Sequence, residues 1–197
     1  MAVIEQGLVG DGFTRSRTSV FVKDIVDGWC AWIGITGNTF MLSPVVGTFS
    51  RELTAIRAKA LDTIGKKRNR EQSDGPPLIM ANLEKIAAKD SRCSKNAPWH
   101  YSGMPLGEDA AEGLLFCLRE HAYPFFQAHI SLLSIVEAMK RGMGGMALPN
   151  YLPIILIKLR LLDDLSSYVD RRVLSAKDEV QGLEYRKYVD ALLKMLC

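Results

Sequence analysis

Residues 28–50, GWCAWIGITGNTFMLSPVVGTFS, decide how this 197-residue chain is read. They contain no Asp, Glu, Lys or Arg, although charged residues make up 24% of the sequence. Apolar residues recur at steps of three or four up to Ile33, and Gly37 and Asn38 then supply turn residues that tolerate positive φ. We interpret the stretch as the end of one amphipathic helix, a turn and the capped start of another, forming a buried corner.

The sequence outside this stretch repeats the helical pattern. Ser43 and Pro44 suit the N-cap and first position of a helix that Gly65 would end. Strand-like patterning is confined to residues 34–40. We therefore predict an all-α fold, a single-domain bundle of six or seven helices over residues 1–197. The remaining predicted helices cover residues 18–33, 77–89, 108–141 with a kink or end at Pro124, 151–169 and 175–196, and a long irregular loop lies near residues 90–107.

Composition excludes several classes of protein. Apolar residues make up 48% of the chain and the net charge is only +3, so neither wholesale disorder nor a dedicated polyanion binder is expected. The cysteines at 30, 93, 117 and 197 are spread singly without a C-x-x-C pair, which argues against a zinc ribbon or thioredoxin motif. We interpret Cys30 and Cys117 as small buried hydrophobes in a reducing compartment.

The charge-free run also raises the question of a membrane segment. At 23 residues it is long enough to span a bilayer, but its glycines, Asn38 and Pro44 would break a continuous helix. A second apolar segment, residues 142–157, is short for a span. Residues 1–14 lack a basic region followed by an apolar core, so no secretory signal is indicated. We predict a cytoplasmic protein, with conditional membrane insertion as one alternative.

A cysteine nucleophile is the best enzymatic hypothesis. Residues 27–32, DGWCAW, resemble the context of the nucleophile in papain-like and peptidoglycan-amidase folds. That resemblance implies a thiolate at Cys30 and a downstream histidine as its base, for which His100 is the candidate. The helical periodicity, however, places Cys30 within a helix, where a buried structural cysteine is the simpler interpretation.

Metal and phosphate motifs give no further candidate. His121 and His129 lie eight residues apart, with Glu120 beside the first, and lack the close spacing of H-E-x-x-H. Neither a P-loop nor a dinucleotide-binding glycine pattern is present. The sequence therefore predicts no metal site and no cofactor.

The strongest local charge feature is a basic cluster. Residues 66–77, KKRNREQSDGPP, form a predicted exposed linker that opens with Lys66, Lys67, Arg68 and Arg70. With Arg57 and Lys59 on the preceding helix, the cluster is a candidate phosphate or partner patch, although Glu71 and Asp74 dilute it.

No catalytic set emerges beside abundant apolar helix surface, so we expect a non-enzymatic interaction protein that binds a protein partner or itself. Such a protein would be an adaptor, an inhibitor or immunity-type binder, or a structural subunit. The alternatives are a cysteine-dependent hydrolase that uses Cys30 and His100, a nucleic-acid-coating or regulatory helical protein, and the membrane-inserting protein.

Overall fold

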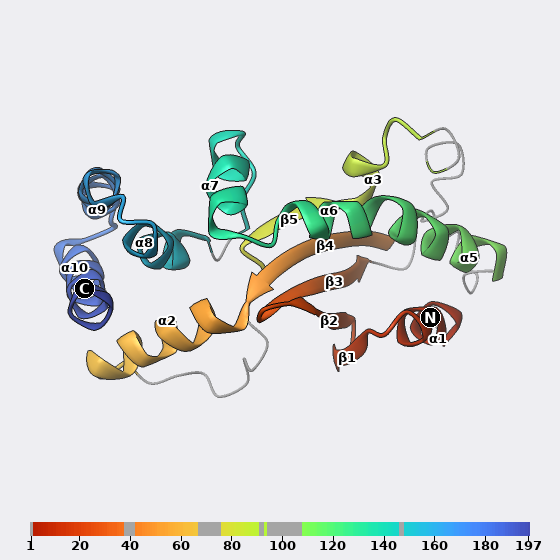
Figure 1. Cartoon of the computed structure of the whole chain (residues 1–197), viewed down its shortest axis with the longest axis horizontal. Helices are drawn as coiled ribbons and strands as arrows, with labels where there is room; N and C mark the ends of the chain where they lie inside the picture. The colour runs from red at the N-terminus through yellow and green to blue at the C-terminus, as the bar shows by residue number, and fades with distance from the viewer. Residues whose placement is uncertain (1, 38–41, 67–75, 91–92, 94–107, 146–147) are drawn as a thin grey trace. The chain divides into compact units, whose positions relative to one another are not determined.

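The all-α prediction is wrong, because the chain contains a five-stranded antiparallel sheet as well as helices (Figure 1). The computed structural model describes residues 2–37, 42–66, 76–90, 93, 108–145 and 148–197. These residues form two compact units. The sheet unit comprises Met1–Phe49 and Pro77–Gly145, and the helical unit comprises Ser50–Pro76 and Met146–Cys197. The single domain expected over residues 1–197 stays a prediction.

The sheet is a meander in which consecutive strands are neighbours. A tight turn at Asp27 and Gly28 joins β2 to β3, with φ values of 44° and 75°. Positive φ at both central residues defines the type I′ turn of a two-residue hairpin, which favours Asp-Gly. The strands are β1 (Thr14–Arg17), β2 (Val20–Val26), β3 (Trp29–Gly37), β4 (Leu42–Ser50) and β5 (Ile79–Asn82).

Burial on both faces explains why strand β3 resembled a helix in sequence. Cys30, Ala31 and Ile33 are all buried, although successive side chains of a strand point to opposite faces. A strand covered on both sides has no polar alternation, so its apolar run cannot be distinguished from a buried helix by periodicity. The buried helical corner predicted over residues 28–50 is therefore replaced by β3 and β4.

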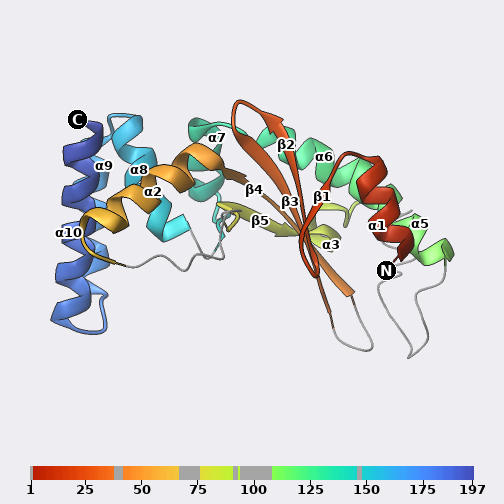
Figure 2. The same cartoon turned by 90° about the horizontal axis from the view of Figure 1, so that it is seen from below.

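Helices cover the sheet unit. The elements α5, η1 and α6 run as one line along the sheet, and α1 contacts α5 (Figures 1 and 2). Pro124 stands at the start of α6 after the π-helical turn η1, which fits the predicted kink because proline cannot donate to the preceding turn. The helix predicted over residues 77–89 is wrong, since β5 and the short α3 occupy that range. These helices are α1 (Ala2–Gly10), α3 (Leu83–Ile86), α5 (Glu108–Cys117), η1 (Leu118–Ala122), α6 (Tyr123–Ala128) and α7 (Leu132–Lys140).

Sequence periodicity is more successful in the helical unit. It contains α2 (Arg51–Thr63), α8 (Leu148–Lys158), α9 (Leu162–Leu174) and α10 (Glu179–Leu196). Every residue of α8 from 151 to 157 is buried, and α8 contacts the other three helices, so it is the central helix of this unit. The segment predicted as one helix over residues 151–169 is broken near Arg160, whose φ is 58°.

Helix ends follow capping chemistry, although at residues other than some of those predicted. Ser50, instead of Ser43, caps α2 by accepting a hydrogen bond from the Leu53 backbone N–H at 3.3 Å. Gly65, with φ of 74°, follows the end of α2 as predicted. Asp178 caps α10 by accepting from the Gln181 N–H at 2.7 Å, so the helix begins later than the predicted start at residue 175.

Among the described residues, no helix is long and apolar enough to cross a membrane. The basic linker expected over residues 66–77 and the irregular loop expected near 90–107 lie largely outside those residues.

Candidate functional site

A proline inside α8 shapes the candidate site in the helical unit. Pro153 has no N–H to donate to the carbonyl of Pro149, four residues earlier. The hydroxyls of Tyr168, on α9, and Tyr185, on α10, donate to that carbonyl at 3.3 and 3.1 Å. Tyr188 donates to the next carbonyl, that of Asn150, at 2.7 Å. Three tyrosines thus join the start of α8 to α9 and α10.

Burial keeps these hydroxyls protonated. It raises the pKa of Tyr185 and of Tyr188 well above the ordinary tyrosine value, and it raises that of Tyr168 in the same direction. Each phenol therefore stays a neutral donor across the physiological pH range. The start of α8 is consequently held in place without a titrating group.

A pocket of about 340 Å³ opens beside these tyrosines. Helix α2, the start of α8, the end of α9, and α10 all contribute to it. Its described lining residues are Arg57, Leu61, Ile64, Lys66, Asn150, Arg172, Ser175, Ala176, Lys177, Gln181, Glu184, Tyr185 and Tyr188.

The pocket carries an excess of positive charge. Among its described lining residues there are four cationic side chains and one carboxylate. That carboxylate, Glu184, is paired with Lys66 at 2.5 Å. The Arg57 guanidinium lies 5.5 Å from the centroid of the Tyr151 ring, a cation–π contact that helps to orient it. Arg172 and Lys177 are exposed at the rim, where α9 gives way to α10.

This arrangement is better suited to binding an anion than to catalysing a reaction of that anion. The arginines offer planar, forked donors that match a carboxylate or phosphate, and Lys177 offers a point charge. Ser175 is the hydroxyl nucleophile candidate, but its Oγ donates to the Arg172 carbonyl at 3.1 Å. No His or Cys occurs among the described lining residues to act as its base.

Sequence analysis identified part of this pocket. Lys66, from the predicted patch, and Arg57 line it together. Lys67, Arg68 and Arg70 lie outside the described residues. Arg172 and Lys177 were missed, because they lie more than 100 residues further along the chain. In the sequence, Arg172 and Lys177 were indicated only by the basic residues that surround the expected break between the last two helices.

The proposed cysteine nucleophile occupies a different setting. Cys30 lies in β3 and not in a helix, and it packs against Val22 and Phe49 in the sheet unit. Its side chain is a fully buried thiol, not part of a disulfide, and its Sγ lies 3.0 Å from the Asp24 Oδ1. His100 lies outside the described residues, so the pairing of Cys30 with His100 stays a prediction.

The remaining histidine and cysteine expectations have mixed outcomes. His121 Nε2 pairs with Asp90 Oδ2 at 3.0 Å, whereas the buried His129 donates from Nδ1 to the Phe125 carbonyl at 2.7 Å. The two histidines therefore have separate partners. Cys117 is disulfide-bonded to Cys93 and is not the free hydrophobe that the sequence suggested.

Comparison with protein-family models, with curated proteins and with solved structures finds no match for this chain. The pocket therefore has to be interpreted from its own chemistry.

Proposed function

We propose that this is a non-enzymatic interaction protein whose helical unit binds an acidic segment of a partner protein. The observation that carries the proposal is the pocket with four cationic side chains and a single carboxylate among its described lining residues. Opposite charge steers such a partner and fixes its register. Carboxylates of Asp or Glu fit the forks of Arg57 and Arg172.

Apolar surface beside the pocket favours a protein partner over a nucleic acid. Val180 and Leu183 are 68% and 55% exposed, and they alternate along α10 with the lining residues Gln181 and Glu184. Inside the pocket, Leu61 and Ile64 add apolar lining. An acidic segment that carries a few leucines would satisfy both surfaces. A nucleic-acid strand would instead require a longer track of cations than the four that line the pocket.

The test is peptide binding measured by fluorescence anisotropy. The probe is a short fluorescein-labelled peptide rich in Glu and Leu, and the matched peptide has Gln in place of Glu. The Glu peptide should bind more tightly, and its affinity should fall as salt rises, because the rim charges are solvent-exposed. Reversing two rim charges, Arg172→Glu with Lys177→Glu, should weaken binding about tenfold, which corresponds to about 1.4 kcal/mol.

The matched control reverses two exposed lysines of α10 outside the pocket, Lys187→Glu with Lys194→Glu. It makes the same change in net charge and should leave binding nearly unchanged. An equal loss of peptide binding in both variants would mean that net charge alone explains the effect. That result would contradict binding at the pocket. Tighter binding of a single-stranded oligonucleotide than of the Glu peptide would favour the nucleic-acid alternative. A cytoplasmic location belongs to the same proposal, and fractionation of the native host would test it.

A further inference from the structure

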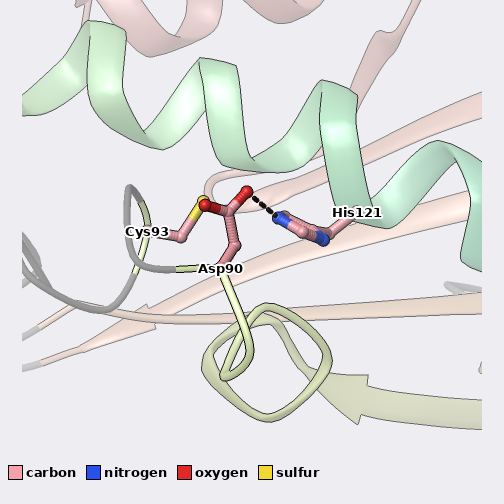
Figure 3. A group of neighbouring side chains, drawn as sticks. All are labelled: Asp90, Cys93 and His121. Atoms are coloured by element: carbon pink, nitrogen blue, oxygen red, sulfur yellow. Dashed lines mark hydrogen bonds and ion pairs between the residues drawn. The ribbon is translucent and has the colours of Figure 1, made fainter.

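A second cluster of reactive side chains lies in the sheet unit, apart from the pocket lining. Asp90, Cys93 and His121 each present a ligand atom, and these atoms all lie within 4.8 Å of one another (Figure 3). Cys93 is also disulfide-bonded to Cys117, so a second sulfur is attached to this group. Three ligand atoms therefore lie together, and the disulfide supplies a fourth candidate ligand next to one of them.

Local structure brings these residues together in two pairs. Cys93 donates its backbone N–H to the Asp90 carbonyl at 3.1 Å, which holds the two residues together. Cys117 ends α5, and His121 follows four residues later in η1, one helical turn along the same helix line. The resulting pattern, D-x2-C and C-x3-H separated by 23 residues, has the two-plus-two form of structural zinc sites.

The ligand atoms of Asp90, Cys93 and His121 lie within 4.8 Å of one another, which is near the separations that tetrahedral zinc requires. Bonds of about 2.0 Å to N and O and about 2.3 Å to S place the ligand atoms of zinc about 3.3 to 3.8 Å apart. The Asp90 oxygen and the His121 nitrogen already lie 3.0 Å apart. Cys93 and Cys117 are 4% and 2% exposed, so the sulfurs are shielded as in structural zinc sites.

We infer that these four residues form a redox-gated Zn²⁺ site: a disulfide when oxidised, and a zinc-binding set of two thiolates, one imidazole and one carboxylate when reduced. Thiolate and imidazole ligands together suit zinc better than the harder Mg²⁺ or Ca²⁺. The inference departs from the sequence prediction of no metal, which considered His121 with His129 instead of with Asp90.

The exchange balances with a dithiol as the reductant. The dithiol gives two electrons and two protons, the bond between Cys93 and Cys117 breaks, and the dithiol becomes a disulfide. Zn²⁺ then displaces both thiol protons into solvent and bonds to the two sulfurs, to Nε2 of His121 and to one Asp90 oxygen. The zinc form would therefore prevail in a reducing compartment that supplies zinc, and the disulfide in an oxidising one.

The experiment compares oxidised and dithiol-reduced wild-type protein, freed of metal with a chelator and then dialysed against Zn²⁺. Bound zinc is measured by inductively coupled plasma mass spectrometry. The reduced protein should retain one zinc per chain and the oxidised protein none. Cobalt(II), added to the reduced protein in place of zinc, should give the visible absorption of a tetrahedral site and a thiolate charge-transfer band. This comparison uses only the wild-type protein, so it tests the inference even if a substituted variant fails to fold.

Variants assign the ligands. Cys117→Ser and His121→Gln should each weaken zinc binding more than about tenfold, with folding confirmed by circular dichroism. Cys197→Ser is the matched control, because Cys197 is a free and exposed cysteine, and it should bind zinc as the wild type does. Equal zinc content in the oxidised and reduced proteins, or a cobalt spectrum without the thiolate band, would overturn the inference. An equal loss in Cys197→Ser and Cys117→Ser would overturn it too.

Discussion

The sheet unit and the helical unit differ in how they are stabilised and in what they present to solvent. The sheet unit is stabilised by the pairing of consecutive strands, by a disulfide and by a buried layer around Phe49. The helical unit packs amphipathic helices around one buried helix, α8, and leaves cations exposed at a pocket. A strand that is buried on both faces has the same apolar periodicity as a buried helix, whereas the packing of amphipathic helices is visible in the sequence pattern.

The largest expected effect comes from a substitution in the core of the sheet unit. Phe49→Ala removes a side chain that is 1% exposed and should cost about 3 to 5 kcal/mol. Trp29 and Trp32 belong to the sheet unit, and no tryptophan falls within the two segments of the helical unit. Urea unfolding followed by tryptophan fluorescence should therefore shift strongly to lower denaturant.

Leu133→Ala is the control for Phe49→Ala, because Leu133 is 65% exposed on α7 of the same unit. It should change stability by less than about 0.5 kcal/mol. A comparable shift in both variants would contradict the assignment of Phe49 to the core.

A smaller effect tests the tyrosine contacts of the helical unit. Tyr168→Phe with Tyr185→Phe leaves the Pro149 carbonyl without its two hydroxyl donors and should cost about 1 to 3 kcal/mol. Hydrogen exchange read by mass spectrometry should rise at the start of α8.

Adding Pro153→Ala to that double variant restores a backbone N–H four residues after Pro149. It should recover part of the lost protection, because the carbonyl regains a donor within the helix. If exchange at the start of α8 were as fast in the triple variant as in the double variant, the account of the missing N–H would be wrong.

The smallest expected effect concerns the hairpin of β2 and β3, which the sequence pattern did not reveal. Gly28→Ala places a side chain at φ of 75° and should cost about 1 kcal/mol, measured from the midpoint of urea unfolding. Gly10→Ala is the matched control, because an added Cβ there meets no atom within 4 Å. Equal midpoints for the two variants would argue against the type I′ turn.

Much of the helical unit was predictable from the sequence, and little of the sheet unit was. The apolar character of α8 and the end of α2 at Gly65 follow from local chemistry. By contrast, β2 and β3 were interpreted as one helix because their apolar residues also fall at steps of three or four. The Asp27-Gly28 pair was the local signal that could have corrected this interpretation.

The candidate sites show the same division. Lys66 and Arg57 are close in sequence and were grouped correctly, whereas Arg172 and Lys177 join them only through the packing of α10 against α2 and α9. Asp90 and His121 are 31 residues apart, and the sequence did not suggest that they pair. Sequence patterns report neighbours along a helix, and they say little about which segments fold together.

The most direct test of the proposed interaction is chemical-shift mapping of the Glu- and Leu-rich peptide on isotope-labelled protein. Perturbations should concentrate on the residues that line the pocket, foremost Arg172, Lys177 and Tyr185, and they should disappear when Arg172 and Lys177 are both changed to Glu. Perturbations confined to the sheet unit, or a map unchanged by the double charge reversal, would contradict the proposed interaction.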